Sequence, residues 1–249
     1  FVELNKRNIQ GVFFYRINGF NEQIRKFLLK YYQTARNTGV VIEGRIPNPN
    51  EKNLAYYEEI MGMQFVLDEQ FIEKSLQKWL PRMNAFQRSN VSKAMFDTLN
   101  QLRNAGKNEN MLKNAYIKFM CWLYYKFERI LSQLGKDTIP KILYEGSISN
   151  YELLFLQVLA KAGCDIVLLQ YEGDAKYLQL DPLSKISKEL KLSEMKAFPK
   201  EFHLQTLRDE IQAELNQERL YGAKTVLCNA TNTWIKGAGF DDIRTSLQM

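Results

Sequence analysis

The chain has 249 residues, of which 45% are hydrophobic and 25% are charged, with a formal net charge of +6. This composition is typical of a folded globular protein and argues against a disordered chain. No apolar run approaches the roughly 18 residues that span a bilayer, so we expect no membrane segment. The basic charge is spread along the chain, so it favours anionic partners in general and does not indicate nucleic acid.

The first residues lack the pattern of a signal peptide, so we expect a soluble cytoplasmic protein. Cys121, Cys164 and Cys228 are odd in number and lie in apolar surroundings, which predicts buried reduced thiols rather than disulfides. His203 is the only histidine, which excludes a histidine-rich metal site, and we predict no metal site. Because the chain lacks an initiator Met and stops just after an apparent helix start, we expect a fragment of a longer protein.

The first strand-helix-strand pattern covers the first 44 residues. Residues 12–17 read as a strand, and apolar side chains at helical spacing follow from Asn21, which is a suitable helix cap. Gly39 stands where a helix C-terminus favours a left-handed residue, and residues 40–44 read as a second strand. Two prolines then predict a loop.

The second pattern begins at Ile139, with a strand up to residue 145, a helix that ends near Gly163 and a strand from Ile166. Glycines stand at similar turns in both patterns. A diverged repeat is one explanation, and the general need of α/β turns for glycine is the other.

We therefore predict an α/β fold of Rossmann-like strand-helix-strand units with a large helical insertion between them. The predicted segments are 1–50 for the first unit, 51–138 for the helices and 139–249 for the second unit, packed with the first. The insertion has helical signals at residues 51–61, 69–80, 84–104 and 110–134. The last of these carries a wide aromatic stripe, which more often forms core than a platform for bases or sugars.

After the second unit, Pro182 opens a lysine-rich stretch that runs to Lys200. A basic amphipathic helix is one interpretation of this stretch, and a solvated surface segment is the other. Residues 203–220 carry helical signals, and residues 224–229 are a further strand candidate.

The turn after residue 145 is the strongest site candidate. In a parallel sheet this turn lies at the carboxyl edge, where open α/β folds bind ligands. Ser149 and Glu152 have capping-box spacing, and Gly146 allows a tight turn whose backbone a ligand can approach. A helix N-terminus attracts phosphate or carboxylate, and Ser147 and Asn150 would add hydrogen bonds. The alternative is that Ser149 only caps a helix and Gly146 only turns the chain.

Glu172 follows the next strand, where an acidic residue contacts ribose in dinucleotide-binding folds. Polar residues at the strand ends of the first unit form a second candidate edge, or are surface charges: Arg16, Asn18, Glu43 and Arg45. The glycine-rich dinucleotide and P-loop motifs are absent, so the cofactor is unknown. Mg²⁺ held by Glu145, Glu172 or Asp174 stays open, and no catalytic residue is indicated.

Residues 114–127, 139–152 and 162–165 resemble the YceG-like family of bacteria, as do residues 13–19 and 46–49. The resemblance implies a component of a biosynthetic module, found beside tellurite-resistance and Ter-type stress genes. The family's members are longer than this chain, and no established reaction or catalytic residue is carried over from them.

Two hypotheses follow. The first is a protein that binds a phosphorylated or nucleotide-like small molecule at the turn of Gly146 to Asn150, and any enzymatic activity would be transferase-like by architecture alone. The second is a non-catalytic module whose helical segment docks a partner protein from the same stress system. A third and weaker idea, nucleic-acid binding through Lys185 to Lys200, would require a steep salt dependence.

Overall fold

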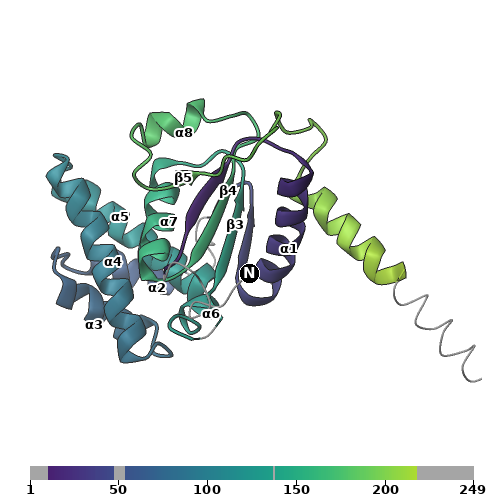
Figure 1. Cartoon of the computed structure of the whole chain (residues 1–249). Coiled ribbons are helices and arrows are strands. Elements are labelled where there is room, and N and C mark those ends of the chain that lie inside the picture. The colour runs from purple at the N-terminus through teal and green to yellow at the C-terminus, as the bar shows by residue number, and fades with distance from the viewer. Residues whose placement is uncertain (1–10, 48–53, 137, 218–249) are drawn as a thin grey trace, which may run out of the picture. The chain divides into compact units, whose positions relative to one another are not determined.

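The computed structural model describes residues 11–47, 54–136 and 138–217 (Figure 1). The chain divides into two units, Phe1–Phe202 and His203–Met249. The first unit is built on a parallel sheet with strand order β2-β3-β4-β1-β5. The strands are β1 (Phe14–Ile17), β2 (Val40–Glu43), β3 (Lys141–Glu145), β4 (Asp165–Leu169) and β5 (Lys188–Glu189). The predicted α/β class is confirmed.

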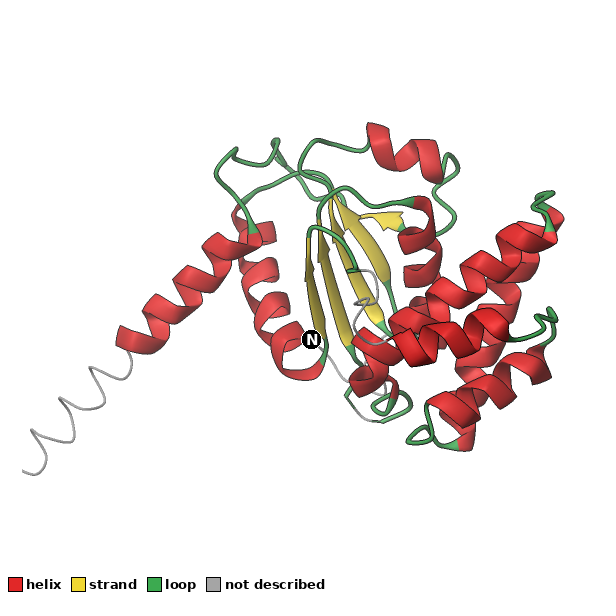
Figure 2. Ribbon diagram, turned by 180° about the vertical axis from the view of Figure 1, so that it is seen from behind, coloured by secondary structure: helices red, strands yellow, loops and turns green. Residues whose placement is uncertain are grey.

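The register joins strands from both predicted units into one sheet. Leu143 of β3 pairs with Val167 of β4, and Val167 also pairs with Tyr15 of β1. β4 is buried along its whole length because helices cover both faces. α1 (Glu22–Thr38) lies on one face, and α7 (Asn150–Ala162) lies on the other with the helices of the insertion (Figures 1 and 2).

The predicted helix of the first unit is confirmed with its cap. The side chain of Asn21 accepts a hydrogen bond from the backbone N–H of Ile24 at 2.9 Å. The left-handed conformation expected at Gly39 is wrong, because Gly39 has a negative φ of −151°. A Cβ there would lie 1.7 Å from the carbonyl oxygen of Lys141, so the close approach of β3 requires glycine at this position.

The insertion between β2 and β3 is helical, as predicted. Its helices are α2 (Leu54–Gly62), α3 (Glu69–Trp79), α4 (Ala85–Asn104), α5 (Glu109–Trp122) and α6 (Glu128–Leu131). The sequence predicts one helix over residues 110–134, whereas the structure places a π-helical turn, η3 (Leu123–Phe127), between α5 and α6. A π turn inserts one residue and rotates the apolar stripe.

The aromatic stripe of the insertion belongs to the core, which confirms the commoner of its two interpretations. Phe119, Trp122 and Phe127 are buried, and their rings lie 5.0–5.6 Å from the ring of Phe155 on α7. Cys121 and Cys164 are buried free thiols, as expected, and burial raises the pKa of Cys121 to about 11. Cys228 lies outside the described residues.

The lysine-rich stretch does not form the amphipathic helix that was one of its interpretations. Helix α8 (Ala175–Leu180) ends at Asp181, and the chain then turns into β5. The Asp181 carboxylate accepts hydrogen bonds from the backbone N–H groups of Lys185 and Ile186 at 2.9 and 2.8 Å, so these amides are held in a turn.

The second unit is described only as far as residue 217, and residues 204–217 are helical in agreement with the sequence. The strand predicted for residues 224–229 lies outside the described residues. No helix in the described part of the chain is long and apolar enough to cross a membrane.

Candidate functional site

The turn after β3 packs tightly against the turn after β2. The backbone N–H of Gly44 donates to the carbonyl of Glu145 at 2.8 Å, which extends the ladder beyond the strands. Gly146 has φ +119°, and a Cβ there would lie 2.7 Å from the carbonyl oxygen of Gly44. Glycine is therefore required at Gly146 for both its conformation and its contact.

The predicted capping box at the start of α7 is present. Ser149 Oγ accepts from the N–H of Glu152 at 3.4 Å, and Glu152 Oε2 accepts from the N–H of Ser149 at 2.9 Å. Glu152 Oε1 also accepts from the N–H of Ile46 at 2.8 Å, and Glu152 is only 3% exposed. The buried Glu152 carboxylate thus already offsets part of the partial positive charge at the N-terminus of α7. An anion at this turn would need a further cation.

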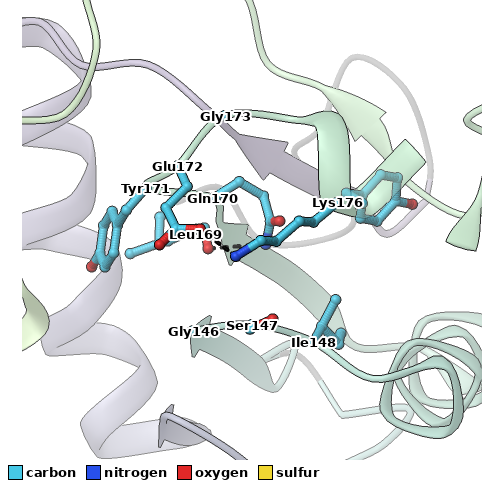
Figure 3. Close-up of a pocket in the computed structure, with 10 residues that line it drawn as sticks. Gly146, Ser147, Ile148, Leu169, Gln170, Tyr171, Glu172, Gly173 and Lys176 are labelled. Carbon is cyan, nitrogen blue, oxygen red and sulfur yellow. Dashed lines mark hydrogen bonds and ion pairs between the residues drawn. The ribbon is translucent and has the colours of Figure 1, made fainter. Parts of the chain in front are cut away.

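Lys176, on α8, is a cation that lines the cavity at this turn. A cavity of about 140 Å³ lies between the turn after β3 and the loop after β4, and Lys176 extends across it (Figure 3). The cavity is lined by Gly146, Ser147, Ile148, Leu169, Gln170, Tyr171, Glu172, Gly173, Lys176 and Tyr177. The Lys176 ammonium lies 2.5 Å from Glu172 Oε2, and this hydrogen bond lowers the pKa of Glu172.

The Lys176–Glu172 pair is at the surface, with the side chains 66% and 75% exposed. Such an exposed pair contributes little to stability. In the structure Glu172 bonds to Lys176, and the ribose contact that the sequence indicates stays a prediction.

Tyr171 faces away from this cation and holds the end of β3. Its hydroxyl donates to Glu145 Oε2 at 2.5 Å. Burial raises the pKa of Tyr171, and the hydrogen bond to Glu145 raises it further. The phenol therefore stays protonated at neutral pH and acts as a donor.

Arg16 lies at the end of β1 and is engaged in contacts within the protein. Its guanidinium is 3% exposed and donates from Nε to both carboxylate oxygens of Asp174, at 2.9 and 2.8 Å. It also donates to the carbonyl of Ser187 at 2.9 Å and lies 4.6 Å from the centre of the Tyr177 ring. Asn18 donates to Glu189 Oε1 at 2.8 Å. These contacts attach α8 and β5 to β1.

The structure therefore separates the predicted site residues into three groups. Gly146, Ser147 and Glu172 line the cavity, whereas Ser149 and Asn150 start α7 beside it. Arg16 and Asn18 bond to the segment that covers β1. The last two lie at the end of β2: Glu43 is its last residue and lines a separate groove at the sheet edge, and Arg45 is exposed. A ligand-binding role for each of these residues stays a prediction.

Sequence reasoning missed Lys176. The only available signal was the spacing of Glu172 and Lys176, four residues apart at the start of a short helix, and this spacing is common on protein surfaces. The Mg²⁺ hypothesis gains no support from the geometry of its three carboxylates, which bond to Tyr171, Lys176 and Arg16. Within residues 11–47, 54–136 and 138–217, no three metal-ligating side chains cluster.

Comparison with known proteins gives one positive finding. The family model described as YceG domain matches residues 3–216, which is most of the chain. The curated proteins and the solved structures that were compared with the chain contain no match.

Proposed function

The chain belongs to the YceG domain family, and we propose that it binds a small phosphorylated or nucleotide-like anion between the turn after β3 and helix α8. The observation that carries this proposal is that Lys176 lies across one cavity from Gly146 and Ser147. The cavity lies at the carboxyl edge of a parallel sheet, where α/β folds bind ligands.

The ligand's anionic group occupies the place beside Lys176. Its oxygens accept from the ammonium and from the hydroxyl of Ser147, which is exposed at the same cavity. A cavity of about 140 Å³ accommodates the anionic group and a small part of the remaining ligand. The larger part of a nucleotide or sugar phosphate extends into solvent, so we expect modest affinity and discrimination chiefly by charge.

A thermal-shift titration tests this function. The purified chain is heated with inorganic phosphate, pyrophosphate, nucleotides and sugar phosphates, and with the matching nucleosides and free sugars. A ligand at about 100 times its Kd adds about 2.7 kcal/mol of stability, which at this chain length raises Tm by about 5–10 °C. The anions are expected to raise Tm, and their neutral counterparts are expected to have no effect.

The matched variants are Lys176→Ala and Lys74→Ala. Lys74 is an exposed lysine on α3 and does not line this cavity. Lys176→Ala removes the shift while its Tm without ligand stays near that of the parent, and Lys74→Ala retains the shift. Equal Tm shifts in both variants would mean that the anion binds elsewhere and would contradict the proposal.

A second candidate function is a non-catalytic module that docks a partner protein through the insertion. One observation favours it: Tyr57 and Met61 lie one turn apart on α2 and are 37% and 42% exposed, with Val66 50% exposed in the following loop. The family resemblance implies a partner from a tellurite-resistance or stress-related biosynthetic module. Tyr57→Ser with Met61→Ser should then abolish association with that partner and leave the anion shift intact.

A further inference from the structure

The outer edge of β2 has backbone groups available for pairing. β2 ends the strand order of the described sheet, so β3 is its only neighbour among the described strands. Alternate residues of a strand direct their N–H and C=O groups to opposite sides. Gly44 donates to Glu145 of β3, so Ile42 and Val40 bond to the same side, and the groups of Val41 and Glu43 point outward.

A basic groove follows this edge. Its volume is about 340 Å³, and it is lined by Ala35, Arg36, Gly39, Val40, Val41, Glu43, Lys126 and Arg129. Three cations from α1, η3 and α6 thus face one carboxylate, that of Glu43. Arg36, Lys126 and Arg129 are all exposed. No salt bridge to the Lys126 ammonium occurs among the described residues.

One contact shows how this edge accepts a donor. Arg129 Nη2 donates to the carbonyl oxygen of Gly39, just before β2 begins. Arg36 Nη1 donates to the hydroxyl of Tyr32 at 3.2 Å and keeps its charge at the groove. The amino end of the edge is therefore closed by an arginine, whereas the outward groups at Val41 and Glu43 remain for a partner strand.

We infer that the outer edge of β2 docks an extended acidic peptide segment of a partner protein, which adds to the sheet as a further strand. Backbone hydrogen bonds to Val41 and Glu43 supply the register, and the peptide's carboxylates face Lys126, Arg36 and Arg129. A second copy of this chain is a poorer occupant, because pairing two β2 edges would bring the same cations opposite each other. This surface is separate from the cavity beside Lys176 and does not depend on the proposed function.

The probe is a short fluorescein-labelled peptide in which glutamate alternates with valine, measured by fluorescence anisotropy against the whole chain. The controls are a peptide with lysine in place of glutamate and a single-stranded oligothymidine. Acidic-peptide binding that weakens as salt rises is expected, with no binding of the basic peptide. Equal binding of the oligothymidine would overturn the peptide assignment, because it would indicate a general polyanion surface.

Two variant pairs separate charge from strand addition. Lys126→Glu should weaken peptide binding about tenfold, whereas Lys26→Glu, an exposed lysine on α1 away from the groove, should not. Val41→Pro removes an outward N–H that β3 does not use, and edge strands tolerate proline at such a position. Val41→Thr keeps that N–H and serves as its control.

The backbone pair decides the mode of binding. Val41→Pro, if still folded by circular dichroism, should lose peptide binding that Val41→Thr retains. Unchanged binding by Val41→Pro would overturn strand addition. A dimer of the parent chain that becomes monomeric in Val41→Pro would assign the edge to a second copy instead, and analytical ultracentrifugation reports it.

Discussion

The loops after β1 and β3 leave the same edge of the sheet, yet they end in different surroundings. Both precede a capped helix: Asn21 caps α1, and Ser149 caps α7. Beside β1, the segment from α8 to β5 is held down by Arg16 through Asp174 and Ser187. Beside β3, the same segment leaves a cavity.

The comparison shows that equivalent local signals do not make equivalent sites. A single segment, residues 174–189, covers the end of β1 and also brings Lys176 to the end of β3. Arg16 and Asn18, at the end of β1, hold this segment in place, so their contacts are within the protein. Ser147, after β3, is exposed and lines a cavity, which supports the proposal that a ligand binds at this end of the sheet.

The largest effect is expected from Arg16→Ala. It leaves Asp174, whose side chain is 14% exposed, without its guanidinium, and loss of one partner of a buried pair costs about 3–5 kcal/mol. Urea unfolding measures this loss. Arg103→Ala, which removes an exposed arginine that bonds to Asn100 on α4, should cost less than about 1 kcal/mol.

The Arg16 variant also tests the comparison. If Arg16→Ala weakened anion binding and left the free energy of unfolding unchanged, Arg16 would be a ligand-binding residue and the two strand ends would form one site. If Arg16→Ala instead lowers the free energy of unfolding by the expected amount, Arg16 has a structural role and the ends of β1 and β3 are separate sites.

Gly146→Ala should destabilise the fold by about 3 kcal/mol, because left-handed strain of about 1–2 kcal/mol adds to the clash with Gly44. Gly106→Ala is the control, since Gly106 has φ +82° and no atom within 4 Å of an added Cβ. It should cost only the strain of about 1–2 kcal/mol. Equal costs for both variants, measured by urea unfolding, would mean that the Gly44 contact is not tight.

Glu172→Gln gives the smallest effect and sharpens the role of Lys176. It removes the carboxylate that competes for the ammonium, so anion affinity should rise a few-fold. The pKa of Glu172 is lowered, so its ion pair with Lys176 persists above the ordinary glutamate value of 4.5 and is lost as pH falls through the lowered pKa. Anion affinity of the parent should therefore rise below pH 4.5 toward that of Glu172→Gln.

A multivalent anion whose charge is constant over this pH range, such as sulfate, is the suitable titrant for isothermal calorimetry. Sulfate affinity that fell in Glu172→Gln would contradict competition and would make Glu172 part of the binding site. If sulfate affinity had the same pH dependence in the parent and in Glu172→Gln, that result would also contradict competition between Glu172 and the anion for Lys176.

Much of the fold could be predicted from the sequence, because helix caps and apolar spacing are local properties. The Asn21 cap, the Ser149–Glu152 capping box and the buried strands at residues 141–145 and 165–169 all appear where the sequence indicates. One of the errors occurs where a distant backbone intervenes. Gly39 is glycine because of Lys141, more than 100 residues away, and no local pattern reveals that contact.

The sequence by itself determined the α/β class, the helical insertion and the turn at Gly146, since each follows from periodicity and turn chemistry over short stretches. Only the tertiary structure decided that β1 lies beside β4, that Arg16 bonds to Asp174, and that Lys176 lines the same cavity as the turn after β3. The physical reason is that strand order and side-chain pairing depend on contacts between segments far apart in the chain, where burial and charge act together.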